Sequence, residues 1–188
     1  MPLTLFRRNP LRNAAELAYR RIVEQARQPG FFGDLGVPDT VDGRFELIVL
    51  HAFLYLRRLK RSYPKSAPLA QRFFDTMFTD FDRSLREMGT GDFSVGREVK
   101  RMAQGFYGRI DAYERGLAGE GAALEAALAR NLFGTASAPP DGLAAIAAYL
   151  RREAEHLDDQ SAAALFAGEI RFGDPPKLRS AVSARGRA

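Results

Sequence analysis

The sequence predicts an all-α fold, a single domain of about seven helices packed around one buried central helix. Apolar residues recur at helical spacing over long segments, with proline, glycine and small polar residues between them. No segment of useful length alternates apolar and polar residues as a β-strand would. With 188 residues, the chain is long enough for one domain with a core and short for two.

Residues that favour helix starts bound most of these segments. Asn9-Pro10 offers a side-chain cap followed by proline at the first helical position. Asp39 or Thr40 is expected to begin the second helix, and Ser66 and Ser94 the third and fourth. The predicted helices span residues 10–28, 40–61, 66–88, 94–117, 122–133, 143–156 and 160–169.

The helix over residues 40–61 is expected to be the buried one, because it is apolar on nearly every side from residue 45 to 59. The loop before it, residues 31–39, contains glycine and proline but also large apolar side chains, so we expect it to pack against the body. Gly105 and Gly108 interrupt the fourth helix, where we expect them to admit a neighbouring backbone.

The helical domain is predicted to span residues 10–170. Residues 1–9 are expected to form a flexible basic N-terminus, and residues 171–188, rich in Pro, Arg and Ser, a disordered basic tail. No apolar run approaches the ~20 residues of a membrane-spanning helix. The first residues lack the order of charge and apolar stretch that a signal peptide has. We therefore expect a cytoplasmic protein.

Composition narrows the chemistry that the chain can perform. It has no cysteine, which excludes disulfides, thiolate metal sites and thiol nucleophiles. The net charge of +5 and the sequence pI of about 9.8 favour anionic partners such as RNA or acidic lipid head groups.

No residue pattern predicts catalysis, a cofactor or a metal site. His51, on the apolar central helix, could be a haem or metal ligand, but a hydrogen-bonded core histidine is favoured. Glu153 and His156 form one Glu-x-x-His motif, whereas a di-iron bundle needs two. Asp75 and Asp82 share a helix face and could do acid–base work, but ion pairs with Arg or Lys of the second or fourth helix are favoured.

Positive charge gathers at the end of the 40–61 helix, where no acidic residue lies between residues 56 and 66. A contact with lipid head groups or ribosomal RNA would explain it. A solvated helix end, where cations complement the helix dipole, explains it more simply. The candidates for an anionic-surface contact are Arg57, Arg58, Lys60 and Arg61.

Phe and Met follow the apolar stripe of the 66–88 helix, and the 31–39 loop adds further apolar residues. The strict helical spacing favours a core role. Phe and Met also suit a groove that accepts an apolar helix of a partner. The candidates for such a contact are Phe31, Phe32, Leu35, Val37, Pro38, Phe74 and Phe78.

Three segments of the chain are long and distinctive. They are LGVPDTVDGRFELIVLHAFLYLRRL (35–59), FFDTMFTDFDRSLREMGTGD (73–92) and VKRMAQGFYGR (99–109). All three resemble the ubiquinol–cytochrome c chaperone family, and the similarity is strongest over residues 19–117. The Arg-, Ala- and Gly-rich composition favours a bacterial member of that family.

The resemblance implies a non-enzymatic chaperone or assembly factor for the cytochrome bc1 complex (respiratory complex III) that binds newly made cytochrome b. Cytochrome b or another bc1 subunit is the implied partner. A small partner protein and a peripheral contact with the anionic inner membrane are further candidates. The resemblance brings no catalytic residue, cofactor or metal with it. The residues leave two alternatives open. One is a basic module that binds ribosomes, RNA or a membrane surface without a chaperone role. The other is a small helical enzyme, such as a hydrolase or a lipid-modifying protein, for which Asp75 and Asp82 are the only candidate carboxylates.

Overall fold

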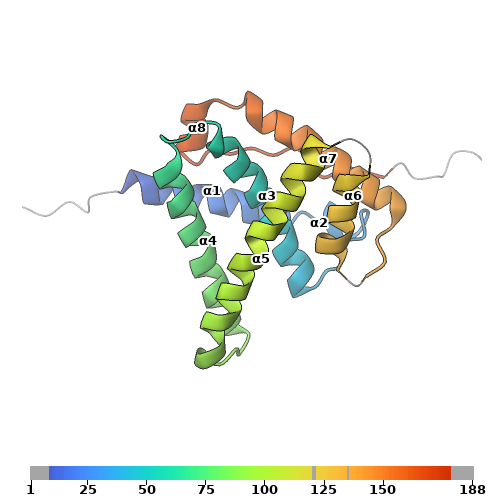
Figure 1. The fold of residues 1–188 in the computed structure, drawn as a ribbon, viewed down its shortest axis with the longest axis horizontal. Coiled ribbons are helices and arrows are strands. Elements are labelled where there is room, and N and C mark those ends of the chain that lie inside the picture. The colour runs from blue at the N-terminus through green and yellow to red at the C-terminus, as the bar shows by residue number, and fades with distance from the viewer. Residues whose placement is uncertain (1–8, 120–121, 135, 179–188) are drawn as a thin grey trace, which may run out of the picture.

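The computed structural model describes residues 9–119, 122–134 and 136–178 and confirms the all-α prediction (Figure 1). These residues form eight α-helices, one π-helical turn and no strand. In chain order the elements are α1 (Pro10–Ala26), α2 (Pro29–Phe32), α3 (Val41–Lys60), α4 (Ala67–Glu87), α5 (Asp92–Ala118), α6 (Ala123–Leu128), η1 (Ala129–Phe133), α7 (Pro140–Asp159) and α8 (Ala162–Phe166). The short helix α2 was not predicted; it occupies the start of the loop expected to be irregular.

Three of the predicted helix starts are confirmed and one is wrong. The side-chain oxygens of Asn9 and Thr40 each accept a hydrogen bond from the backbone N–H three residues later, at 3.2 and 3.1 Å. Ser66 stands at the N-cap position of α4, as predicted, but its side chain makes no capping hydrogen bond. Its hydroxyl instead donates to the carbonyl of Leu59 at 2.6 Å and so ties α4 to the last turn of α3. Ser94 lies inside α5, which begins two residues earlier.

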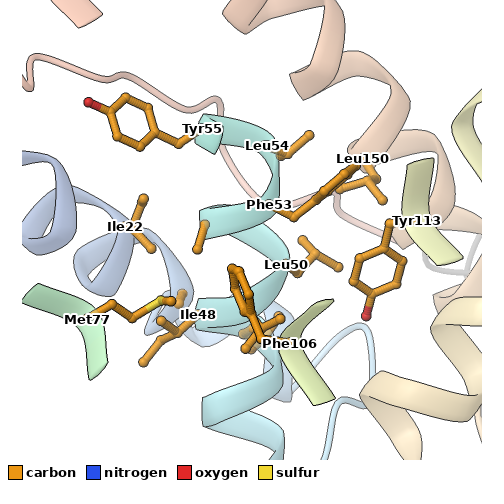
Figure 2. Packing of buried hydrophobic residues seen from close by; sticks show 14 of the residues in the cluster. Ile22, Ile48, Leu50, Phe53, Leu54, Tyr55, Met77, Phe106, Tyr113 and Leu150 are labelled. Carbon is orange, nitrogen blue, oxygen red and sulfur yellow. The ribbon is translucent and has the colours of Figure 1, made fainter. Parts of the chain in front are cut away.

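Helix α3 is the central helix, as predicted, and every residue from Glu46 to Tyr55 is buried. Figure 2 shows side chains from four helices converging on it. Ile22 of α1 and Met77 of α4 lie on one side, and Phe106 of α5 on another. The burial of α3 on all sides follows from its nearly continuous apolar sequence, which needs neighbours in every direction.

Helices α4 and α5 run antiparallel and are joined at one end by residues 88–91. That joined end projects from the body, and the other ends spread apart over α3 (Figure 1). A buried ion pair holds α5 against α3: Arg109 Nε donates to Glu46 at 2.6 Å, and a second guanidinium nitrogen reaches the other carboxylate oxygen. Burial raises the pKa of Glu46, and Arg109 opposes that shift. The bidentate geometry fixes the position of α5 and with it one wall of the site described below.

Residues 171–178 do not form part of a disordered tail, which corrects the predicted boundary at 170. The Gly173 N–H donates to Glu153 at 2.9 Å, and Gln25 Nε2 donates to the Gly173 carbonyl at 2.8 Å. Phe172 packs edge-on against the His51 ring, with the ring centroids 5.0 Å apart. We call residues 167–178 the strap, since they tie α1 to α7 and α3. The other predicted flexible residues, 1–8 and 179–188, lie outside the described residues.

Candidate apolar binding groove

The loop predicted to contact a partner lies mostly in the core. Phe31 and Leu35 are fully buried and Val37 is 2% exposed, so they have no surface to offer; Phe32 and Pro38 are half-buried. The loop packs as expected, and α3 accommodates it at Gly43, where a Cβ would overlap the Pro38 carbonyl. For the three buried residues, the prediction of a partner contact is therefore wrong.

An apolar groove instead opens where the spread ends of α4 and α5 leave the end of α3 partly uncovered. Its volume is about 310 Å³. It is lined by Leu56, Lys60, Tyr63, Ser66, Ala67, Ala70, Gln71, Phe74, Phe106, Tyr107 and Ile110. Along α4 the lining runs from residue 67 to 74, which at 1.5 Å per residue makes the groove about 10 Å long.

Stacked aromatic rings close one end of the groove. Phe74 stacks on Tyr107 across the α4–α5 interface, with ring centroids 5.8 Å apart and an interplanar angle of 27°. Phe78 packs behind Phe74, with the ring centroids 4.4 Å apart, and is 8% exposed. It therefore supports the groove without lining it. Of the seven residues predicted to bind a partner, Phe74 alone lines the groove.

Two tyrosines that the sequence analysis did not single out stand in solvent at the groove. Tyr63 is 74% exposed and Tyr107 is 62% exposed. Tyr63 belongs to the chain break before α4, and Tyr107 lies one position off the apolar stripe of α5. Both positions could have been recognised in the sequence. A tyrosine in a chain break, or one position off the apolar stripe of a helix, is expected to face away from the core. Together Tyr63 and Tyr107 expose an aromatic surface at the groove.

The basic cluster at the end of α3 is largely turned inward. Arg58 Nε and Nη2 donate to the carbonyls of Leu157 and Gln160, at 3.0 and 3.1 Å, and so satisfy the end of α7. Arg57 and Arg61 both lie beside Asp158, at 3.5 and 2.6 Å. The prediction that all four cations face an anionic surface is therefore wrong for Arg57 and Arg58, which are mostly buried in this contact.

Lys60 is different from its neighbours. It is exposed, it lines the groove, and no ion pair joins it to any residue that the structure describes. It is also the one charged side chain among the groove-lining residues.

The interpretation of His51 as a core histidine is confirmed. It is fully buried, with Nδ1 at 2.7 Å from the Leu47 carbonyl and Nε2 at 2.9 Å from the Tyr149 hydroxyl. Burial lowers the pKa of His51 to about 4, so the ring is neutral at physiological pH. A neutral ring has one donor and one acceptor, so Nδ1–H donates and Nε2 accepts from Tyr149. Both nitrogens are thus engaged, and neither is available to a metal or haem.

The carboxylates predicted as ion-paired find partners on their own helix. Asp75 accepts from Gln71 at 2.8 Å and Asp82 from Arg86 at 2.7 Å, so the expected partners on the second and fourth helices are wrong. The hydrogen bond from Arg86 lowers the pKa of Asp82 below its usual range. Asp75 lines a polar groove between α1 and α4 that Asp82 does not reach. The two carboxylates therefore do not converge on one site.

The Glu-x-x-His motif separates into two roles. His156 is exposed, as expected of a helix end, but Glu153 is 1% exposed and accepts the strap N–H of Gly173. Within the described part of the chain, no three His, Asp or Glu side chains gather as metal ligands would. No helix among those residues has the length and hydrophobicity to cross a membrane.

Comparison with known proteins identifies the family. The ubiquinol-cytochrome C chaperone family matches residues 33–172. Ubiquinol-cytochrome c reductase complex assembly factor 1 of Mus musculus is 27% identical over 160 residues, which cover 85% of this chain and 54% of that protein. Protein CBP3, mitochondrial, of Saccharomyces cerevisiae is 30% identical over 107 residues, 55% of this chain and 32% of that protein. The chain thus spans about half the length of the mouse relative.

A solved structure agrees with the sequence comparison. The crystal structure of the Cbp3 homolog from Brucella abortus superposes with a TM-score of 0.79 at 41% identity, over 93% of this chain and 97% of that one. The family match covers three quarters of the chain, including α3, α4, α5 and the groove between them. This chain belongs to the ubiquinol-cytochrome C chaperone family.

Proposed function

We propose that the chain is a non-enzymatic assembly factor for respiratory complex III and that it holds an apolar segment of newly made cytochrome b in the α3–α4–α5 groove. The observation that carries this proposal is the exposed pair Tyr63 and Tyr107 beside an apolar groove. The free energy falls when an apolar partner covers such a surface and displaces water from it.

The mouse relative is named as an assembly factor for the ubiquinol-cytochrome c reductase complex, and an apolar segment from a subunit of that complex would suit this groove. Subunits of a membrane complex carry apolar helices, which aggregate in water until they are inserted. A groove about 10 Å long matches two turns of such a helix, whose apolar side chains at i, i+3 or i+4 and i+7 would enter it. Tyr rings have broad apolar faces and a polar tip, so they can cover a client and remain soluble without one.

The inventory of ionisable groups supports a binding role without catalysis. His51 is neutral and enclosed, and the carboxylates of Asp75 and Asp82 lie apart. Glu46 and Glu153 are buried, and each is engaged in holding elements together. We propose a peripheral position at the inner membrane, where the client is inserted, with Arg61 as an exposed cation that could face anionic lipid.

The test is complementation in a strain that lacks this gene. We expect the deletion to lower assembled complex III and to leave cytochrome b unassembled, and the unaltered gene to restore both. The double variant Tyr63→Ser, Tyr107→Ser should restore little, whereas Met88→Ser should restore fully. Met88 is a matched control, since it is 52% exposed but lies at the far end of α4.

Native gels that report complex III, and a photoreactive residue at position 107 that reports cytochrome b, separate the outcomes. Normal complex III in the deletion strain would contradict the assembly role. Full rescue by the tyrosine double variant, with no cross-link to cytochrome b, would remove the groove from the proposal. A salt-dependent affinity for RNA with normal complex III would favour the basic-module alternative.

A further inference from the structure

We propose that the groove selects apolar helical segments that carry a carboxylate near one end, and that Lys60 and Lys65 attract that carboxylate. This inference rests on the proposed function and specifies the chemistry of the client that the same groove accepts. It is carried by the distribution of charge around the groove.

The chain between residues 47 and 74 contains no Asp or Glu, although it supplies most of the groove. Six cations fall in this stretch: Arg57, Arg58, Lys60, Arg61, Lys65 and Arg72. Acidic residues of α5 and α7 reach the arginines at the end of α3: Glu114 pairs with Arg57, and Asp158 lies beside both Arg57 and Arg61. Lys60 and Lys65 are exposed and have no ion pair with any described residue.

The two ends of the groove therefore differ. The end beside the α3–α4 connection carries Lys60, with Lys65 in the connection itself. The other end is closed by the stack of Phe74 on Tyr107, which bears no charge. No acidic side chain lines the groove anywhere along its length. A segment with an acidic residue at one end is thus oriented by attraction at the lysines, and a basic residue there is repelled.

The residue types fit this division of work. Arginine has a rigid, planar fork, which suits the fixed contacts that Arg57 and Arg58 make to α7. Lysine is a point charge on a flexible stem, which can follow a carboxylate without a fixed geometry. Because the lysines are exposed, we expect the selectivity to be modest, about fivefold at low salt, and to weaken as salt is raised.

The experiment uses the full chain and three fluorescent peptides of about 16 residues, long enough to form helix on binding. The peptides share one Leu- and Ser-rich amphipathic sequence with blocked termini and carry Glu, Gln or Lys at both ends. Placing the residue at both ends removes any dependence on binding direction. Fluorescence anisotropy at low and high salt gives each affinity. Circular dichroism verifies that each protein variant is folded.

We expect the Glu peptide to bind about fivefold more tightly than the Gln peptide, and the Lys peptide to bind most weakly. The double variant Lys60→Glu, Lys65→Glu should invert this order, and Lys177→Glu, an exposed lysine on the strap, should leave it unchanged. Tyr107→Ser should weaken all three peptides equally, because it removes apolar contact and no charge.

Equal binding of the three peptides to the unaltered protein would overturn the inference and leave groove docking intact. Absence of binding by every peptide would also overturn it. Binding to phosphatidylglycerol vesicles that the double lysine variant abolishes, without any preference among peptides, would assign the lysines to the membrane instead. The amount of assembled complex III in the deletion strain is measured independently of peptide binding. Failure of the assembly role can therefore be told apart from each of the peptide and vesicle outcomes.

Discussion

Protonation of His51 should make this protein lose stability in mild acid. The ordinary pKa of 6.5 applies in the unfolded chain, and burial lowers the pKa of His51 to about 4 in the folded one. Above pH 6.5 the ring is neutral in both states and contributes nothing. As the pH falls from 6.5 to 4, the unfolded chain takes up the proton first, so unfolding becomes more favourable. At 1.36 kcal/mol per pH unit, the loss reaches about 3 kcal/mol at pH 4.

The assay is urea denaturation from pH 7.5 to 4.5, on the unaltered protein and on His51→Gln. The carboxylates titrate in both proteins, including Glu46, whose raised pKa acts in the opposite direction, so the difference between the two proteins isolates the histidine. The variant should be the less stable at pH 7.5, because glutamine cannot reproduce both hydrogen bonds. That deficit should shrink by about 2–3 kcal/mol by pH 4.5. Parallel stability profiles would refute the enclosed, neutral state of this ring.

Three further substitutions, two of them paired with a comparison variant, test the packing of the helices. Glu46→Ala leaves its arginine partner half-buried and should lower the free energy of unfolding in urea by about 2–4 kcal/mol, whereas Glu98→Ala breaks an exposed pair and should cost at most about 0.5 kcal/mol. Gly168→Ala should cost about 2 kcal/mol or more in thermal unfolding, because φ is +80° and the new Cβ would overlap a carbonyl of α1; Gly108→Ala, in open space inside α5, should stabilise by about 0.5–1 kcal/mol. Arg58→Ala removes two hydrogen bonds at the end of α7 and should cost about 1–3 kcal/mol, read as faster hydrogen exchange in that last turn.

The fold class and the longest helices were predictable because their signals are local. The caps at Asn9 and Thr40, and the apolar spacing between them and the next breaks, lie within the segments that they define. The strap was not predictable in this way. Its backbone is satisfied by Gln25 and Glu153, which are 148 and 20 residues away from Gly173, so composition alone made it resemble a disordered tail.

The candidate site was predicted only in part, for the same reason. Phe74, which lines the groove, could be singled out because an aromatic stripe is visible in sequence. The groove itself exists because α4 and α5 diverge (Figure 1), which no local pattern encodes. The inward orientation of Arg57 was not predictable, because its partner Asp158 lies 101 residues further along the chain. Gly108 was expected to admit a neighbouring backbone, but no other helix or loop of the described chain comes within 4 Å of where its Cβ would be.

The size of the groove bears on how an assembly factor would release its client. Stable protein complexes bury about 1,200–2,000 Å² in total, and contacts below that range are usually transient. The surface that two helical turns can bury in a groove of about 310 Å³ falls well short of that area. If the groove holds a client as proposed, its size favours a weak, rapidly reversible contact, in which the exposed tyrosines would supply most of the attraction and the lysines the direction. A client held in this way can leave for the growing complex without a separate source of energy, because the larger interfaces formed there outcompete the groove.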